Sequence, residues 1–231
     1  MPDSPRGVAG RTVLVAGATS TSGAVASRVL AGAGARVIAV GRDPEKLAAL
    51  VVDTPRDRRV RTEVCDLTDE RGVATLAERL RADGIRVDGL LHLVGGWRGG
   101  GGLARQSDED YRFLEGGLTA LRHVTRAFDA DLRASDAARL AIVSSTAVAR
   151  PLAGGANYAA VKAASEAWAR AVAQGFAKAA RDGHVPLRAA SVVFRVTALA
   201  GLEDALATRF AALWDADAAS VNDTVVTLGQ D

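Results

Sequence analysis

The chain alternates between short apolar, β-branched runs and longer segments with helical periodicity, and this alternation limits the folds open to it. The apolar runs, which we predict to be strands, cover residues 12–17, 35–40, 59–64, 87–94, 139–145, 187–194 and 223–228. Between them, segments rich in Ala, Leu and Arg, such as 24–33, 69–83, 107–132 and 158–180, follow the period of a helix. Apolar strands separated by helices indicate a parallel sheet covered on both faces. The sequence therefore predicts an α/β fold, a doubly wound Rossmann-type domain with a mainly parallel sheet of about seven strands.

No proline-rich linker, composition shift or internal repeat divides the 231 residues. We expect a flexible N-terminal tail over residues 1–10 and a single domain over residues 11–231. A chain of this length can bury a substantial core.

Charge and composition exclude several classes of protein. The 29 Lys and Arg residues against 27 Asp and Glu residues leave a net charge of +2, spread along the chain without an aromatic-interleaved basic stripe. We therefore predict no nucleic-acid binding, and the absence of a long apolar segment predicts no membrane span. The single Cys65 indicates a reducing compartment, so we expect a cytoplasmic protein. The three histidines lack partners at ligand spacing, and no metal site is expected.

A turn bounded by glycines follows the first predicted strand. Gly17 can take the tight turn, and Gly23 lets the next helix approach the strand closely. The residues between them that offer N–H groups and hydroxyls at a helix N-terminus are Thr19, Ser20, Thr21 and Ser22. Such a terminus stabilises a pyrophosphate. An ordinary strand-to-helix turn rich in N-cap residues is the alternative, but the place of this turn after the first strand favours nucleotide binding.

The end of the second predicted strand bears on which nucleotide binds. An NAD-specific site places a carboxylate there for the adenosine ribose, whereas this chain has Gly41 followed by Arg42. A guanidinium matches a phosphate with two hydrogen bonds, and no carboxylate is present to repel it. A solvated Arg before the Asp-Pro of a helix start is the alternative. We predict that NADP(H) is favoured over NAD(H).

Three residues late in the chain could form a proton-donating site. Tyr158 and Lys162 lie four residues apart in a predicted helix and therefore share a face. An ammonium beside a phenol lowers the phenol pKa from about 10, which makes the phenol a better acid at neutral pH. Ser145, at a strand end, can polarise a substrate oxygen. Taken alone, such a Tyr and Lys pair is usually an amphipathic surface feature.

Together these residues resemble the short-chain dehydrogenase/reductase family across essentially the whole chain. The family pattern is a glycine-rich turn, an Asp after the third strand, then Ser and Tyr-x-x-x-Lys, and "NYAAVKAA" is the most specific match here. The resemblance implies an NAD(P)H-dependent oxidoreductase that transfers hydride to a small carbonyl or conjugated C=N or C=O substrate. It implies that Tyr158 donates the proton and that Lys162 also binds the nicotinamide ribose. It further implies a homodimer or homotetramer formed by the helices at 107–132 and 158–180.

The resemblance also implies further cofactor contacts. Asp66, after the third predicted strand, is expected to accept a hydrogen bond from the adenine amine; capping of the next helix is the alternative. The other implied contacts are Leu67, Val94, Gly95, Val196 and Thr197.

The chain departs from the family pattern at several places. Thr21 replaces the middle Gly of the turn, and "HLVG", residues 92–95, replaces an Asn-Asn-Ala-Gly stretch. The Asn that usually completes a catalytic tetrad falls on Gly117, so water or nothing replaces that side chain. The Pro-Gly pair after the sixth strand is replaced by Phe194-Arg195. These departures favour a second interpretation, a non-catalytic dinucleotide-binding sensor or degenerate partner subunit. The intact Ser, Tyr and Lys favour an enzyme.

Two of the departures resemble the dihydropteridine reductase branch of the family, which reduces quinonoid dihydropterins. They are "LVGGWRGGGG" and "SVVFRVTAL". That branch typically prefers NADH and has Ala at the position of Ser145, so the resemblance is partial. Trp97 could stack on a flat substrate, or it could cap a flexible glycine loop. The segment after residue 197 is short for a substrate lid, which disfavours a steroid or acyl-carrier substrate.

Overall fold

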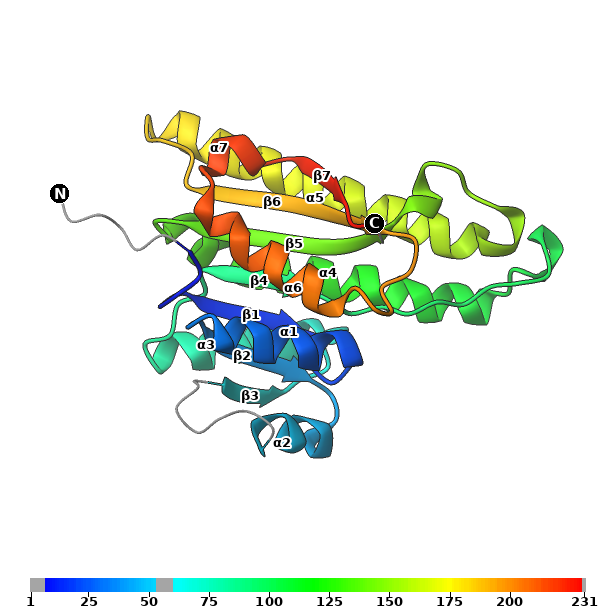
Figure 1. Cartoon of the computed structure of the whole chain (residues 1–231), viewed down its shortest axis with the longest axis horizontal. Helices are drawn as coiled ribbons and strands as arrows, with labels where there is room; N and C mark the ends of the chain where they lie inside the picture. Colours follow the sequence, from blue (N-terminus) through cyan, green and yellow to red (C-terminus); the bar gives the residue numbers. More distant parts are fainter. Residues whose placement is uncertain (1–6, 53–59, 230–231) are drawn as a thin grey trace.

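The computed structural model describes residues 7–52 and 60–229, and its centre is a seven-stranded sheet in the order β3-β2-β1-β4-β5-β6-β7. Every neighbouring pair of strands is parallel (Figure 1). The strands are β1 (Thr12–Ala16), β2 (Arg36–Gly41), β3 (Val60–Val64), β4 (Gly89–His92), β5 (Ala138–Ser145), β6 (Ala189–Val196) and β7 (Thr224–Thr227). The predicted doubly wound parallel fold is confirmed.

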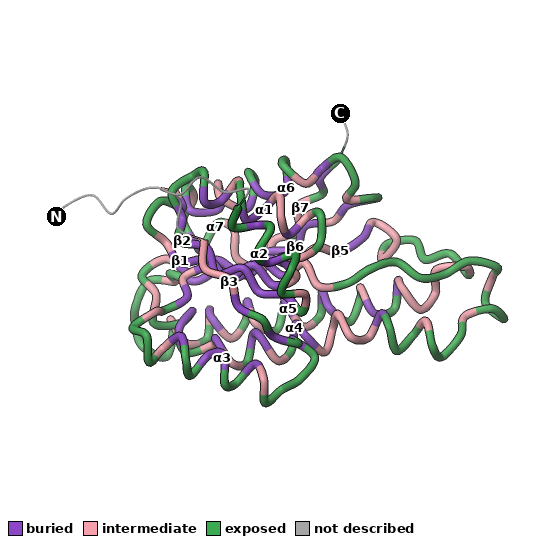
Figure 2. The backbone as a smooth tube through the Cα atoms, turned by 90° about the horizontal axis from the view of Figure 1, so that it is seen from below, coloured by how far each residue is buried: buried purple, intermediate pink, exposed green. Residues whose placement is uncertain are grey.

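Helices cover both faces of this sheet, which is the purple band between two helical layers in Figure 2. The helices are α1 (Thr21–Gly32), α2 (Pro44–Val52), α3 (Glu70–Ala82), α4 (Asp108–Ala134), α5 (Ala156–Asp182), α6 (Glu203–Ala211) and α7 (Ala218–Val221). One core cluster joins the sheet to α1, α2 and α6, and the other joins it to α3, α4 and α5. Among the described residues, none of these helices combines the length and apolar character needed to cross a membrane.

The inner strands are mostly apolar because both of their faces are buried, whereas the edge strands β3 and β7 carry more polar and more exposed residues. In β1, Val13 and Val15 pack in the cluster with α1 and α6, whereas Leu14 and Ala16 pack in the cluster with α3 to α5. Successive strand side chains point to opposite faces, so a strand covered on both sides needs an apolar residue at each position. This is the physical basis of the strand prediction.

The structure moves two predicted boundaries. The sixth strand, predicted over 187–194, reaches Val196, so the Phe194-Arg195 pair lies inside β6. Phe194, in the place of the proline, has the backbone N–H that a proline lacks, and it pairs with strands on both sides, opposite Val143 and Val226. Residues 1–6 of the predicted tail lie outside the described residues, but Val8 is buried in the core. The packed part of the chain therefore begins before residue 11.

The carboxyl ends of the strands open at one edge of the sheet. The helices α4 and α5 are each 27 residues long. Their first turns project beyond the strands at this edge as an arm (Figure 1). Ligands of doubly wound sheets bind beyond the carboxyl ends of the strands. The fold therefore brings the predicted site residues, which follow β1 to β6, to this edge.

Candidate active site

Two adjoining cavities lie along the carboxyl edge of the sheet, and both are lined by Ser20, Leu93, Val94 and Gly95. The first has a volume of about 560 Å³, and the predicted residues on it are Gly17, Thr19, Ser20, Arg42, Asp66, Leu67, Val94 and Gly95. The second has a volume of about 1020 Å³, and the predicted residues on it are Ser20, Ser22, Val94, Gly95, Trp97, Ser145, Tyr158, Lys162, Val196 and Thr197. The fold thus brings almost all the predicted site residues to one continuous cleft.

The glycine turn has the backbone geometry that its sequence predicts. Gly17 has φ +89°, and a Cβ atom there would lie 3.0 Å from the carbonyl carbon and oxygen of Leu93. A Cβ atom on Gly23 would lie 2.2 Å from the Gly17 oxygen, so only glycine allows α1 to start this close to β1. Gly23 and the exposed Thr21 are the two predicted residues that line neither cavity.

The Ser20 side chain forms its hydrogen bonds within the turn. Its hydroxyl donates to the Gly17 oxygen at 2.8 Å and accepts from the Gly23 N–H at 3.0 Å, so Ser20 is the N-cap of α1. The hydroxyl that we expected to face a pyrophosphate is therefore already used twice within the protein. Thr19 and Ser22 lie on the cavity walls, Thr19 on the first cavity and Ser22 on the second.

The first cavity ends at the second and third strands. A Cβ atom on Gly41 would lie 2.5 Å from Cγ2 of Thr19, so the Thr19 methyl fills the space that a side chain at position 41 would need. Arg42 follows as an exposed side chain on the cavity wall. Asp66, which lines the same cavity, accepts hydrogen bonds from the N–H of Thr68 at 2.9 Å and from the Thr68 hydroxyl at 2.7 Å. These bonds, with a smaller contribution from Arg42, lower the pKa of Asp66.

The helix after β3, α3, is capped by a residue other than Asp66. Asp69 is the N-cap of α3 and accepts from the N–H of Arg71 at 3.1 Å. The alternative role for Asp66, as this cap, is wrong. Asp66 closes a turn and leaves its carboxylate at the cavity.

Ser145, Tyr158 and Lys162 meet on the second cavity. Ser145 ends β5 and caps a short 3₁₀ turn, where its hydroxyl accepts from the N–H of Ala147 at 3.1 Å. Tyr158 lies in the first turn of α5 and Lys162 in the next turn, with its Nζ atom 5.7 Å from the centre of the Tyr158 ring. The Lys162 ammonium donates to the carbonyl oxygen of Val143 at 2.8 Å.

Burial dominates the electrostatics of these groups. It lowers the pKa of Lys162 to about 8, against the opposing effect of the Glu166 carboxylate. It also raises the pKa of Tyr158, and the group that acts to lower it is the Ser145 hydroxyl. The expected lowering of the Tyr158 pKa by Lys162 is not found in the protein alone, where burial raises that pKa and the Ser145 hydroxyl is the group that opposes the rise.

The sequence interpretation missed an ion pair behind this site. Arg195 holds Glu166 with two hydrogen bonds, of 2.8 Å from Nε and 2.5 Å from a terminal nitrogen, and so ties α5 to β6. Glu166 is buried although it is charged. Two signals were available, because Glu166 follows Lys162 by four residues and Arg195 occupies a place where the family pattern has glycine.

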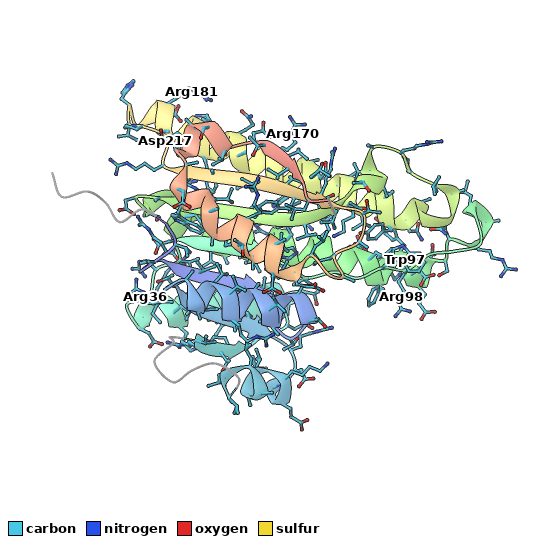
Figure 3. All side chains as sticks on the ribbon, in the orientation of Figure 1. Arg36, Trp97, Arg98, Arg170, Arg181 and Asp217 are labelled. Atoms are coloured by element: carbon cyan, nitrogen blue, oxygen red, sulfur yellow. The ribbon has the colours of Figure 1, made fainter. Side chains whose placement is uncertain are left out.

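Trp97 lies at the rim of the second cavity, on the loop beyond β4 (Figure 3). Its side chain is 65 % exposed, which argues against a buried plug for the glycine loop. Three residues on, the backbone of Gly100 donates to the Gly154 oxygen at 2.7 Å, so this loop is tied to the segment before α5. Arg98 stacks over the ring of Phe113 at 4.4 Å.

Two of the departures from the family pattern contact each other. The buried His92, at the end of β4, is hydrogen-bonded through Nε2 to the carbonyl oxygen of Gly117 in α4 at 3.0 Å. Nothing in either residue alone predicts this contact. Across residues 7–52 and 60–229, no cluster of three or more His, Cys, Asp or Glu side chains could hold a metal ion.

Several curated proteins are similar to this chain. A Streptomyces (strain C5) protein, named as a candidate daunorubicin C-13 ketoreductase, is 40 % identical over 92 residues, which are 39 % of this chain and 32 % of that protein. The nodulation protein G of Rhizobium meliloti is 33 % identical over 166 residues, which are 71 % of this chain and 66 % of that protein. The chain thus matches about a third of the length of the first relative and about two thirds of the second.

Solved structures share the fold over nearly the whole chain. A metagenomic short-chain oxidoreductase in complex with NADP is 26 % identical with a TM-score of 0.80, over 97 % of this chain and 99 % of that one. A short-chain dehydrogenase/reductase from Mycobacterium ulcerans has a TM-score of 0.81 at 21 % identity, over 96 % of this chain and 89 % of that one. The sequence profile described as short chain dehydrogenase matches residues 11–180. The chain therefore belongs to the short-chain dehydrogenase/reductase family of oxidoreductases, whose members bind nicotinamide dinucleotides.

Proposed function

We propose that this protein is an NADP(H)-dependent reductase of a small carbonyl or conjugated C=N or C=O substrate. The observation that carries the proposal is that Ser145, Tyr158 and Lys162 line one cavity, which continues into the cleft along the glycine turn. The residues on the second cavity include Arg150 and Lys162 but no carboxylate, so a neutral or anionic substrate suits it.

The residues present fit a dinucleotide. The close approach at Gly17 and Gly23 leaves backbone and the residues Thr19 and Ser22 at the cleft, as a pyrophosphate requires. Asp66 would receive the adenine amine, and Lys162 would bind the nicotinamide ribose. The other proposed contacts are Leu67, Val94, Gly95, Val196 and Thr197. A bound nicotinamide supplies the hydride.

The chain itself manages the proton. Tyr158 donates it to the substrate oxygen, and Ser145 holds that oxygen by a hydrogen bond. Burial keeps the phenol protonated, as its raised pKa indicates, so the acid is present at neutral pH. Lys162 supplies a positive charge beside the phenolate that forms when the proton leaves.

The preference for NADP(H) rests on the end of β2. A carboxylate at position 41 would have to displace the Thr19 methyl, and Arg42 follows on the same wall. No ion pair joins Arg42 to another described residue at salt-bridge distance, so its guanidinium is available for a 2′-phosphate. The NADP complex of the metagenomic relative supports this preference.

A non-catalytic dinucleotide sensor is the second candidate, favoured by the altered residues His92 and Gly117. A screen of NADPH oxidation over ketones, quinones and quinonoid pterins, with NADPH binding followed by nicotinamide fluorescence, separates the two. Turnover in any class supports the reductase. Tight NADPH binding with no turnover in all three classes would establish the sensor.

We further propose a homodimer or homotetramer formed through the outer faces of α4 and α5, in a reducing compartment such as the cytoplasm. A groove of about 430 Å³ between these helices, lined by Arg126, Trp168 and Val172, offers a surface for a second copy. Light scattering after size-exclusion chromatography measures the state. A monomer at micromolar concentration would contradict this part.

A further inference from the structure

His92 presents one bare nitrogen to the interior. Its Nε2 atom lies 3.0 Å from the carbonyl oxygen of Gly117, and because a carbonyl only accepts, Nε2 carries the hydrogen. Burial, aided by the charge of Lys162, lowers the pKa of His92 to about 4, so the ring is neutral at physiological pH. The Nδ1 atom is then an acceptor without a hydrogen.

This acceptor has no hydrogen-bond partner among the described residues, although it is fully buried. A buried polar atom without a partner costs free energy, so such atoms are usually satisfied by protein or by ordered water. His92 lines a cavity of about 20 Å³ together with Gly117, Tyr158 and Lys162. That volume is enough for one water molecule.

The same cavity is also lined by Tyr158, by Ser165, whose hydroxyl donates to the carbonyl oxygen of Val161, and by Lys162. The Lys162 ammonium has three hydrogens, and one is donated to the carbonyl oxygen of Val143. The side of the cavity formed by α4 is apolar, with Leu114, Leu118 and Leu121 around Gly117. His92 Nδ1 is therefore the acceptor through which β4 and α4 can support the ammonium.

We propose that His92 is a positioning residue for Lys162: a water molecule in this cavity donates to His92 Nδ1 and accepts from the Lys162 ammonium. His92 and Gly117 then act as one unit, in which the Gly117 carbonyl fixes the ring and the ring holds the water. The role of Lys162 itself rests on the proposed function, but the arrangement of its ammonium can be tested without a substrate.

Other charged groups near Lys162 also influence its pKa, and a test of His92 must leave them unchanged. On α5, the Glu166 carboxylate raises the Lys162 pKa, and Arg195 from β6 holds that carboxylate. The other titratable group of α5 near Lys162 is Tyr158, whose ring centre lies 5.7 Å from the Lys162 Nζ atom and whose pKa is raised by burial. On β4, His92 is neutral. The variants must therefore change His92 alone and leave the pair of Glu166 and Arg195 intact.

Lysine labelled with ¹³C at Cε gives a direct measure, because the chain contains only Lys46, Lys162 and Lys178. The first and last have side chains 66 % and 69 % exposed, and Lys162→Met assigns the third signal. A pH titration then gives the Lys162 pKa in wild type, which we expect at about 8.

Two substitutions of His92 separate its nitrogens. Asn places an amide where Nδ1 lies, and Gln places one where Nε2 lies. We expect His92→Gln to keep the Gly117 contact, lose the water and increase the acid dissociation constant of Lys162 roughly three- to tenfold. We expect His92→Asn to leave that constant within about twofold, even if the melting temperature falls.

Two results would overturn the inference. An unchanged Lys162 titration in both variants, or an equal shift in both, would mean that packing or the Gly117 contact matters and the Nδ1 acceptor does not. If the variants do not fold, wild-type protein with ¹⁵N-labelled histidine remains. The Nδ1 signal of His92 should then move as Lys162 titrates, and a signal flat through that pH range would overturn the inference.

The failure of this inference is distinguishable from failure of the proposed function. A reductase with normal turnover and an unchanged Lys162 titration in His92→Gln would lose only the water bridge. A protein without turnover could still show the coupling between His92 and Lys162.

Discussion

The two halves of the cleft differ in how far their charged groups are withdrawn from water. In the first half, Arg42 and Asp66 are exposed at the ends of β2 and β3. In the second half, His92 is buried and Lys162 half-buried, and burial shifts the pKa of His92 to about 4 and that of Lys162 to about 8. Exposed charges can discriminate between ligands but are screened by salt, whereas buried groups keep a protonation state set by the protein. Under the proposed function, we therefore expect the first half to select the cofactor and the second half to transfer the proton.

The largest effect should come from the acid in the buried half. Tyr158→Phe keeps the ring and removes the proton donor, so turnover should fall by about 10²- to 10⁴-fold while NADPH binding stays within about twofold. Tyr111→Phe is the matched control, because Tyr111 is the other tyrosine of the chain and is 41 % exposed on α4. Steady-state turnover and fluorescence titration measure both. A fully active Tyr158→Phe variant would remove the proton-transfer role from this half.

The next effect concerns stability and pH. The Lys162 pKa falls from 10.5 to about 8, so between these values the unfolded chain binds more protons than the native protein. The contribution of Lys162 to stability therefore rises with pH across this window and is least favourable below pH 8. Lys162→Met should be more stable than wild type at pH 7, by at most about 3 kcal/mol, and this advantage should shrink towards pH 10.

Urea unfolding of wild type and Lys162→Met at pH 7 and pH 10 measures this effect. The difference in unfolding free energy between the two proteins removes the contributions of groups that both contain, such as Tyr158, whose pKa is raised by burial. Because Lys162 lies in the buried half, the difference in unfolding free energy between the two proteins should hardly change with salt concentration. A stability difference that does not vary with pH would show that the Lys162 ammonium is as hydrated as a surface lysine.

A smaller effect is expected in the exposed half. Arg42→Ala should weaken NADPH binding about tenfold or more and leave NADH binding nearly unchanged, because only the 2′-phosphate is lost as a partner. The difference should decrease as salt is added. Arg36→Ala is the control, since Arg36 lies at the amino end of the same strand, away from the cleft (Figure 3). Tighter binding of NADH than NADPH by wild type would reverse the cofactor assignment.

The smallest effect should appear at the rim. Trp97→Ala is expected to raise KM for planar conjugated substrates roughly two- to tenfold and to leave NADPH affinity unchanged. Leu152→Ala is the control, because Leu152 lines the same cavity and is 71 % exposed but has no aromatic face. The melting temperature should stay within about 2 °C, since an exposed side chain contributes little to folding. Loss of stability and of all ligand binding together would make Trp97 a structural residue instead.

The fold and the site edge followed from the sequence because local rules decide them. A strand buried on both faces must be apolar throughout, and the turn after β1 needs glycine where φ is +89° at Gly17. Residues at the carboxyl ends of parallel strands lie at the same edge of the sheet, so their proximity can be predicted without knowing how the side chains pack. The helices α6 and α7 are not among the predicted helices, and with 9 and 4 residues they are too short to display a clear helical period in the sequence.

The rest of the site depends on contacts and burial that a sequence does not display. The contact between His92 and Gly117 spans 25 positions, and that between Glu166 and Arg195 spans 29. The direction of the Tyr158 pKa shift was wrong because the spacing to Lys162 is visible in the sequence while desolvation is not. Likewise, an N-cap preference at Ser20 does not reveal that its hydroxyl is already committed to Gly17 and Gly23.

The contact between His92 and Gly117 also constrains how this protein can evolve. A Cβ atom at position 117 would lie 3.0 Å from the Val94 oxygen and 3.4 Å from the Gly95 Cα atom, so an Asn there requires the loop to shift. Such an Asn would also enter beside an imidazole that already holds the helix carbonyl. Residues in contact show interaction terms in double-mutant cycles, so Gly117→Asn should be tolerated less well with His92 than with Asn at position 92. The two departures from the family pattern therefore depend on each other, because a change at one position alters which residues the other position can accept.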